Sequence, residues 1–240
     1  MDVGPHSWWG LILEVFMGKE LTDVLTQLLG NLNKYYTGKK FEKYTDQISR
    51  LTVKYSNLDI KERHQVVYDS LCKRGVELSK PGNLRDENKL KYFLRYCEAA
   101  IYDLSDDMQP LTWIMRTFMV TTMFFYLLTP IYFDFVLPLI MVVPVFLGLR
   151  GMKKRSLNGL ITGCSVIPLA IMVSVVHFKS MFAALNTGYD KYVADLSTSY
   201  GFSLELTQGL LTTMNILALI MLISGIATAY LGLKHNKMFL

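Results

Sequence analysis

The sequence predicts an all-α protein in which an N-terminal helical bundle precedes a four-helix transmembrane region built from two hairpins. Charge separates the two parts: residues 1–110 hold 16 Lys/Arg and 16 Asp/Glu, whereas residues 111–240 hold 9 and 4. A largely uncharged stretch of about 18 residues or more can cross a bilayer as a helix. Four such stretches occur, at about 111–133, 131–149, 157–178 and 206–232. We therefore expect a soluble cytoplasmic helical domain over 1–110 and a four-span transmembrane domain over 111–240.

The net charge agrees with this division. The +5 of the whole chain comes from residues 111–240, where 9 minus 4 gives 5, while residues 1–110 sum to zero. Basic residues at span ends set the orientation of a membrane protein. The basic balance therefore does not indicate nucleic acid, and the lipid bilayer is the partner that the sequence predicts.

Apolar residues in the soluble domain recur every three or four positions, which is the spacing of one helix face. The expected helices cover 7–33, 41–56, about 59–75 and 86–105. Asp59 and Glu62 are spaced as a capping box that opens the third helix, and Gly75 is a candidate for its end. Trp8 and Trp9 either pack in the core of this bundle or lie on the cytoplasmic leaflet, where Trp is favoured.

Basic residues near the spans predict the orientation. The loop between the second and third spans is the densest basic loop near the membrane, and such loops stay in the cytoplasm. Its topology determinants are Arg150, Lys153, Lys154 and Arg155. Both other loops, at Asp134 and over 179–205, lack this positive excess and are expected outside. We expect an integral membrane protein with both termini cytoplasmic, and no cleavable signal peptide, because the N-terminus lacks a basic segment followed by an apolar run.

Small and polar residues inside the spans are candidates for helix packing or for lining a pore: Asn215, Thr212, Thr213, Ser165, Gly159, Gly163 and Gly225. Gly159 and Gly163 lie four apart, as do Gly225 and Ala229, and such pairs permit close helix contact. Asn215 is the least expected of these residues in lipid. Its amide can bridge helices by hydrogen bonding or contribute to a pore lining.

Prolines and aromatic residues give further local expectations. Pro138 and Pro144 both lie in the second span, so we expect this span to bend most. Pro168 can kink the third span. The loop over 179–205 carries apolar residues at helical spacing, from Phe182 to Tyr200, which indicates a short helix at the outer interface or a partner-binding surface.

Residues that perform chemistry show no recognised pattern. The sequence has no HExxH, GxSxG, Walker A or GxGxxG motif, and its four histidines are far apart. We expect no cofactor, no metal site and no enzymatic activity, with free thiols at the three cysteines. His177, near the outer end of the third span, is expected to be an interface residue rather than a proton or metal group.

These features favour a non-enzymatic multi-pass membrane protein that acts as an assembling or accessory subunit of a membrane complex. Its spans would associate with copies of themselves or with other membrane proteins, and its cytoplasmic domain would dock a protein partner or regulate assembly. Two alternatives stay open. One is a homo-oligomeric channel lined by Asn215 and gated by the N-terminal domain. The other is a membrane enzyme that acts on lipid.

Overall fold

The computed structural model describes residues 21–80 and 82–240. Every element within these residues is an α-helix or a short 3-10 helix, which confirms the all-α class. The chain forms two compact units that divide between Met108 and Gln109, each described here by itself. The part of the first expected helix before residue 21, with Trp8 and Trp9, lies outside the described residues.

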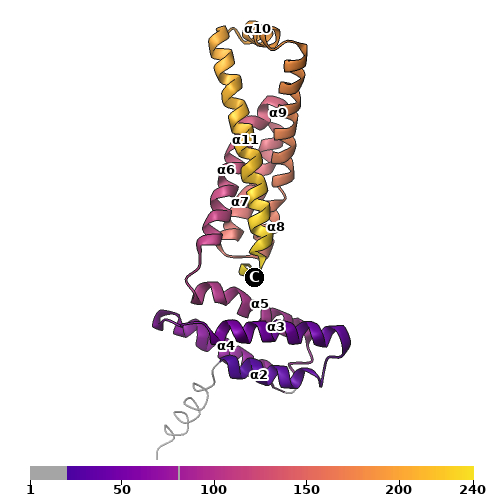
Figure 1. Ribbon diagram of the computed structural model, residues 1–240, viewed down its shortest axis with the longest axis vertical. Helices are drawn as coiled ribbons and strands as arrows, with labels where there is room; N and C mark the ends of the chain where they lie inside the picture. The colour runs from indigo at the N-terminus through magenta and orange to yellow at the C-terminus, as the bar shows by residue number, and fades with distance from the viewer. Residues whose placement is uncertain (1–20, 81) are drawn as a thin grey trace, which may run out of the picture. The chain divides into compact units, whose positions relative to one another are not determined.

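The N-terminal unit contains four described α-helices (Figure 1). They are α2 (Leu21–Leu32), α3 (Gly38–Ser56), α4 (Gln65–Leu78) and α5 (Glu87–Leu104), with the 3-10 helix η1 (Glu62–His64) directly before α4. Each α-helix turns an apolar stripe inward, and fully buried leucines such as Leu28, Leu71 and Leu90 form one core. Burying such side chains is the main force that holds the helices together.

Two expectations about the third helix are wrong. Gly75 does not end α4, which continues to Leu78. A Cβ at Gly75 would lie 2.5 Å from Cγ1 of Val24 and 2.9 Å from Cζ of Phe93, so the glycine allows α2 and α5 to pack closely on α4. The helix also begins at Glu62, as η1, and no side chain caps that end. Asp86 does form a cap, because its carboxylate accepts a hydrogen bond from the backbone N–H of Asn88 (3.0 Å) at the start of α5.

The second unit contains four helices that are long and apolar enough to cross a membrane. They are α6 (Gln109–Tyr132), α7 (Val136–Lys153), a third span over Leu157–Asn186, and α11 (Leu204–Lys234). The third span consists of α8 (Leu157–Cys164) and α9 (Ile167–Thr187), and α10 (Tyr189–Tyr200) connects α9 to α11. The helix expected in the 179–205 loop is therefore shorter, because Phe182 belongs to α9.

The interruption of a span occurs in the third one and not in the second. α7 runs through Pro144 without a break, whereas α8 and α9 are separated at Ser165 and Val166. Pro168 has no backbone N–H, so it cannot donate to the carbonyl of Cys164, four residues earlier. The N–H of Val166 instead bonds to the carbonyl of Gly163, as in a tighter turn.

The second hairpin is longer than the first. At 1.5 Å per residue, the 31 residues of α11 extend for about 46 Å, and the 18 residues of α7 for about 27 Å. A bilayer has a hydrocarbon core of about 30 Å. α9 and α11 consequently continue past the turn between α6 and α7, and α10 joins their far ends (Figure 1).

Candidate functional site

A buried hydrogen-bond network joins three of the spans. His177 of α9 is fully buried. Its Nδ1 lies 2.5 Å from the hydroxyl of Tyr132, at the end of α6, and its Nε2 lies 2.8 Å from Oδ1 of Asn215 in α11. If the Asn215 oxygen accepts from Nε2–H, Nδ1 is left to accept from the tyrosine hydroxyl. The interface level expected for His177 stays a prediction, while these two partners satisfy its polar atoms inside the helix bundle.

Other polar groups in the spans also find partners within the chain. The hydroxyl of Thr121 in α6 donates to that of Ser224 in α11 (2.8 Å). One turn away, Thr228 donates to Thr117 (2.9 Å). The hydroxyl of Ser174 in α9 reaches the carbonyl oxygen of Ala218 in α11 (3.2 Å). These bonds link α6, α9 and α11, and they add hydrogen bonding to the packing of a membrane bundle.

The structure places the polar candidates of the sequence in different surroundings. Asn215 is half-buried and bonded to His177. Thr212 and Thr213 are exposed, and their hydroxyls donate to backbone carbonyls one turn earlier in α11. Ser165 is exposed at the break in the third span and donates to the carbonyl of Thr162 (2.7 Å). Within the part of the chain that the structure describes, Asn215 is the one of these four residues that forms a hydrogen bond to another helix.

The glycines that the sequence indicated as helix-packing candidates lie at contacts between helices. Gly163 in α8 faces Gly148 in α7, where a Cβ at Gly148 would come within 2.6 Å of the Gly163 Cα. A Cβ at Gly159 would lie 2.5 Å from the carbonyl carbon of Gly151. Gly225 in α11 is buried, with room for ordinary contact only. Glycines on both helices thus allow the backbones of α7 and α8 to come into close contact.

The topology determinants lie together at the end of this hairpin. Arg150, Lys153 and Lys154 are exposed, whereas Arg155 is half-buried. The Nε of Arg155 donates to the carbonyl oxygen of Met238 (3.1 Å), so this side chain also holds the segment that follows α11.

A cavity of about 440 Å³ lies at the opposite end of the membrane unit. The last residues of α6 contribute Tyr132, α10 contributes Leu196, and the start of α11 contributes Thr207 and Leu211. Most of the described residues that line it are aromatic or aliphatic. Tyr132 connects it to the buried network, because the hydroxyl of this residue is bonded to His177.

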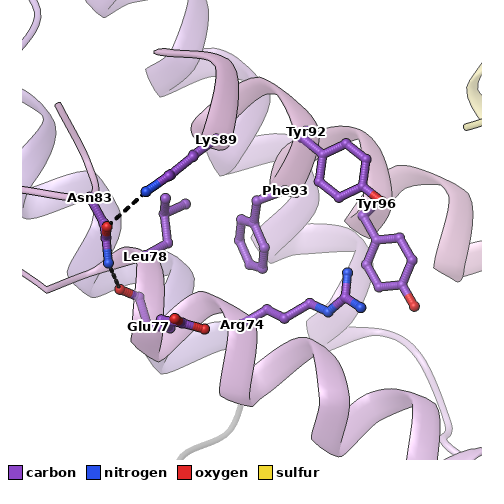
Figure 2. Close-up of a pocket in the computed structure, with 8 residues that line it drawn as sticks. All are labelled: Arg74, Glu77, Leu78, Asn83, Lys89, Tyr92, Phe93 and Tyr96. Carbon is purple, nitrogen blue, oxygen red and sulfur yellow. Dashed lines mark hydrogen bonds between the residues drawn. The ribbon is translucent and has the colours of Figure 1, made fainter. Parts of the chain in front are cut away.

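The N-terminal unit has a smaller groove, of about 220 Å³, between α4 and α5 (Figure 2). The guanidinium of Arg74 lies 4.6 Å from the ring centre of Tyr96, which is a cation–π contact. Tyr92 stacks on Tyr96, with ring centres 6.4 Å apart, and has 58% of its surface exposed. Phe93 and Leu78 are buried beneath them. This groove, defined by Arg74, Tyr92 and Tyr96, was not predicted, because its residues come from two helices and form no motif.

In the N-terminal unit, two acidic side chains each bind several basic residues. Hydrogen bonds from Lys40, Lys91 and Tyr44 lower the pKa of Glu87 to about 2, and they tie α3 to α5. Asp106, which follows α5, binds Lys61, His64 and Arg63 of the segment at η1, and these bonds hold its pKa well below its usual range.

The thiols have surroundings that disfavour reactivity. Burial raises the pKa of Cys72 to about 11 and holds the pKa of Cys97 further above its ordinary range. A thiol must lose its proton to act as a nucleophile or metal ligand. Among the described residues, no group of three His, Cys, Asp or Glu side chains is placed to hold a metal ion.

Comparison of the chain with protein families, with curated proteins and with solved structures finds no match.

Proposed function

We propose that this chain is a non-enzymatic subunit of a membrane complex, anchored by its four spans, whose N-terminal unit docks an acidic segment of a protein partner. The main support for this proposal is the groove formed by Arg74, Tyr92 and Tyr96. Arginine and tyrosine are enriched among the residues that dominate binding energy at protein interfaces. A partly exposed pair of stacked tyrosines above an apolar floor provides such an anchor point.

Charge indicates the chemistry of the partner. Residues 73–96, which include the groove, hold seven Lys/Arg and three Asp/Glu, a net charge of +4. Residues 1–110 as a whole are neutral, with 16 of each. The positive charge is therefore concentrated around the groove, and an acidic partner would be attracted and oriented by it.

The spans support an anchoring role over a pore. Hydroxyl and imidazole groups in α6, α9 and α11 bond to one another or to backbone within the chain. The exposed side chains of α7, such as Leu139, Val143 and Phe146, are apolar and suit lipid or another membrane protein. A shared pore would instead need a continuous polar face directed at neighbouring copies.

The function is tested by crosslinking and native mass spectrometry of the full chain from its own membranes. A photoreactive amino acid at position 92 should crosslink a distinct protein. Truncating a dominant interface residue costs about 2 kcal/mol or more, which is roughly thirtyfold in affinity. We therefore expect R74E and Y92A to lose the partner.

The matched control is Y35A, which removes another exposed tyrosine of the N-terminal unit, outside the groove. This variant should keep the partner. A complex made only of identical copies would favour the channel instead, and a partner held equally by R74E and by Y35A would exclude docking at the groove.

A further inference from the structure

The cavity at the α10 end has the size of a ligand site and an uncharged lining. Its volume of about 440 Å³ lies within the range of about 300–1,000 Å³ found for small-molecule sites. None of the described residues that line it is charged. Tyr132, Tyr192, Tyr200 and Phe202 form its aromatic part. The lining therefore suits an apolar occupant.

Two polar groups of the lining already have partners. The hydroxyl of Tyr132 is bonded to His177. The hydroxyl of Thr207 donates to the carbonyl oxygen of Ser203 (3.0 Å). A peptide brings backbone N–H and C=O groups that need hydrogen bonds when they are buried. A hydrocarbon chain needs none, whereas a peptide would have to rely chiefly on the hydroxyls of Tyr192 and Tyr200, the second of which belongs to a residue that is 68% exposed.

The cavity also lies where a lipid can reach it. α6 ends at Tyr132 and α7 begins at Val136, so this turn marks one boundary of the shorter hairpin. Ile131 and Leu210 line the cavity and are 47% and 41% exposed, on helices whose outer faces are apolar. Aromatic side chains gather at this level of membrane proteins, at the border of the hydrocarbon.

We propose that this cavity binds one acyl chain of a bilayer phospholipid, which enters past Ile131 and Leu210. Tyr132 forms a wall of the site, and the network through His177 to Asn215 fixes the position of its ring. This lipid site is independent of the groove between α4 and α5, which belongs to the other compact unit. Either site can therefore fail without the other.

The experiment uses the full chain in vesicles of phosphatidylcholine that contains a photoreactive diazirine in one acyl chain. After irradiation, the labelled residues are mapped by mass spectrometry. We expect labelling of the peptides that contain Tyr132 and Tyr200 to exceed that of the lipid-facing peptide around Leu139 by at least fivefold. Labelling that is even along all exposed apolar faces would mean surrounding lipid only and would overturn the site.

A matched pair of variants tests the cavity itself. L210W adds volume at a lining residue, whereas L206W adds the same volume one turn earlier, at a 50% exposed leucine outside the lining. L210W should reduce cavity labelling at least fivefold, and L206W should leave it unchanged. Labelling around Leu139 reports that each variant is folded and inserted. L196W, on α10, fills the cavity from another wall and should act like L210W; equal cavity labelling in all three variants would refute the site.

Discussion

His177 illustrates how one residue connects distant parts of the membrane unit. It is fully buried, and both ring nitrogens have partners, on α6 and on α11. A neutral imidazole can satisfy both contacts, because one nitrogen donates and the other accepts. Both ring nitrogens are thus used to hold α9 between α6 and α11.

Replacing Asn215 should destabilise the membrane unit. In N215L the Nε2 of His177 loses its partner while it stays buried. An unsatisfied buried polar group costs about 1–3 kcal/mol. We expect N215L to lower the unfolding midpoint in detergent, whereas T213V should have little effect, because the exposed Thr213 bonds only to its own helix. Equal midpoints for N215L and the parent would show that the network does not hold the helices together.

Glu87 should make the stability of the N-terminal unit depend on pH. Its pKa is about 2 in the folded protein and 4.5 ordinarily, so its contribution is present above about 4.5 and is lost as the pH falls towards 2. E87Q should have a lower free energy of unfolding than the parent at neutral pH, and this difference should become smaller as the pH falls from about 4.5 to about 2. The free energy of unfolding is measured from the loss of helix content during denaturation at several pH values. E42Q removes another glutamate, an exposed one on α3, and should show no such narrowing.

The sequence identified Asn215 as a bridging candidate but gave no partner for it. Asn215 and His177 are 38 positions apart, and His177 and Tyr132 are 45 apart. Periodicity within a helix reports which face is apolar, and it carries no information about which face of another helix lies opposite. For the same reason, the contact between Arg74 and Tyr96 could not be predicted.

At the scale of elements, glycines determine how α7 and α8 pair. Gly148 and Gly151 on one helix face Gly163 and Gly159 on the other, so the backbones touch directly. The spacing of Gly159 and Gly163 predicted a close contact without naming the helix that they meet. The helices themselves were predicted well, since long apolar runs and amphipathic stripes are local signals. Helix ends were predicted less well, because packing around Gly75 overrides its tendency to end a helix.

A single methyl group at this contact should separate the two helices. In G159A the new Cβ would lie 2.5 Å from the carbonyl carbon of Gly151, which is backbone and cannot rotate away. Overpacking of this kind typically costs about 1–3 kcal/mol. We expect a lower unfolding midpoint for G159A in detergent.

The control for this substitution is G209A in α11. A Cβ at Gly209 meets no atom within 4 Å, so this variant should be at least as stable as the parent, because alanine favours helix. Equal stability of G159A and G209A would contradict the glycine contact.

At the scale of the whole molecule, charge remains the feature that divides the chain. The chain divides into its two compact units between Met108 and Gln109, and the charge pattern changes near Pro110. The orientation in the membrane is a prediction from the same pattern, with Arg150, Lys153, Lys154 and Arg155 facing the cytoplasm.

Cysteine labelling tests that orientation. In intact cells, an impermeant maleimide should modify D195C, on α10, and should reach K154C only after the membrane is permeabilised. Both native residues are exposed, so access is set by the membrane side alone. The parent chain gives the background of its three thiols. Labelling of K154C in intact cells, with D195C protected, would reverse the predicted orientation.

The break between α8 and α9 divides the third span between two sets of neighbours. α8 packs chiefly on α7 through the glycine contact, while α9 packs on α11 and α6 and shares the His177 network. The carbonyl of Cys164 receives no hydrogen bond from residue 168, because Pro168 has no backbone N–H. The joint at Ser165 and Val166 therefore lacks one of the backbone hydrogen bonds of a continuous helix. We therefore expect that a tilt of the α7–α8 hairpin would be taken up at this joint rather than passed on to the cavity near α10, because kinks form where a proline removes a helical hydrogen bond.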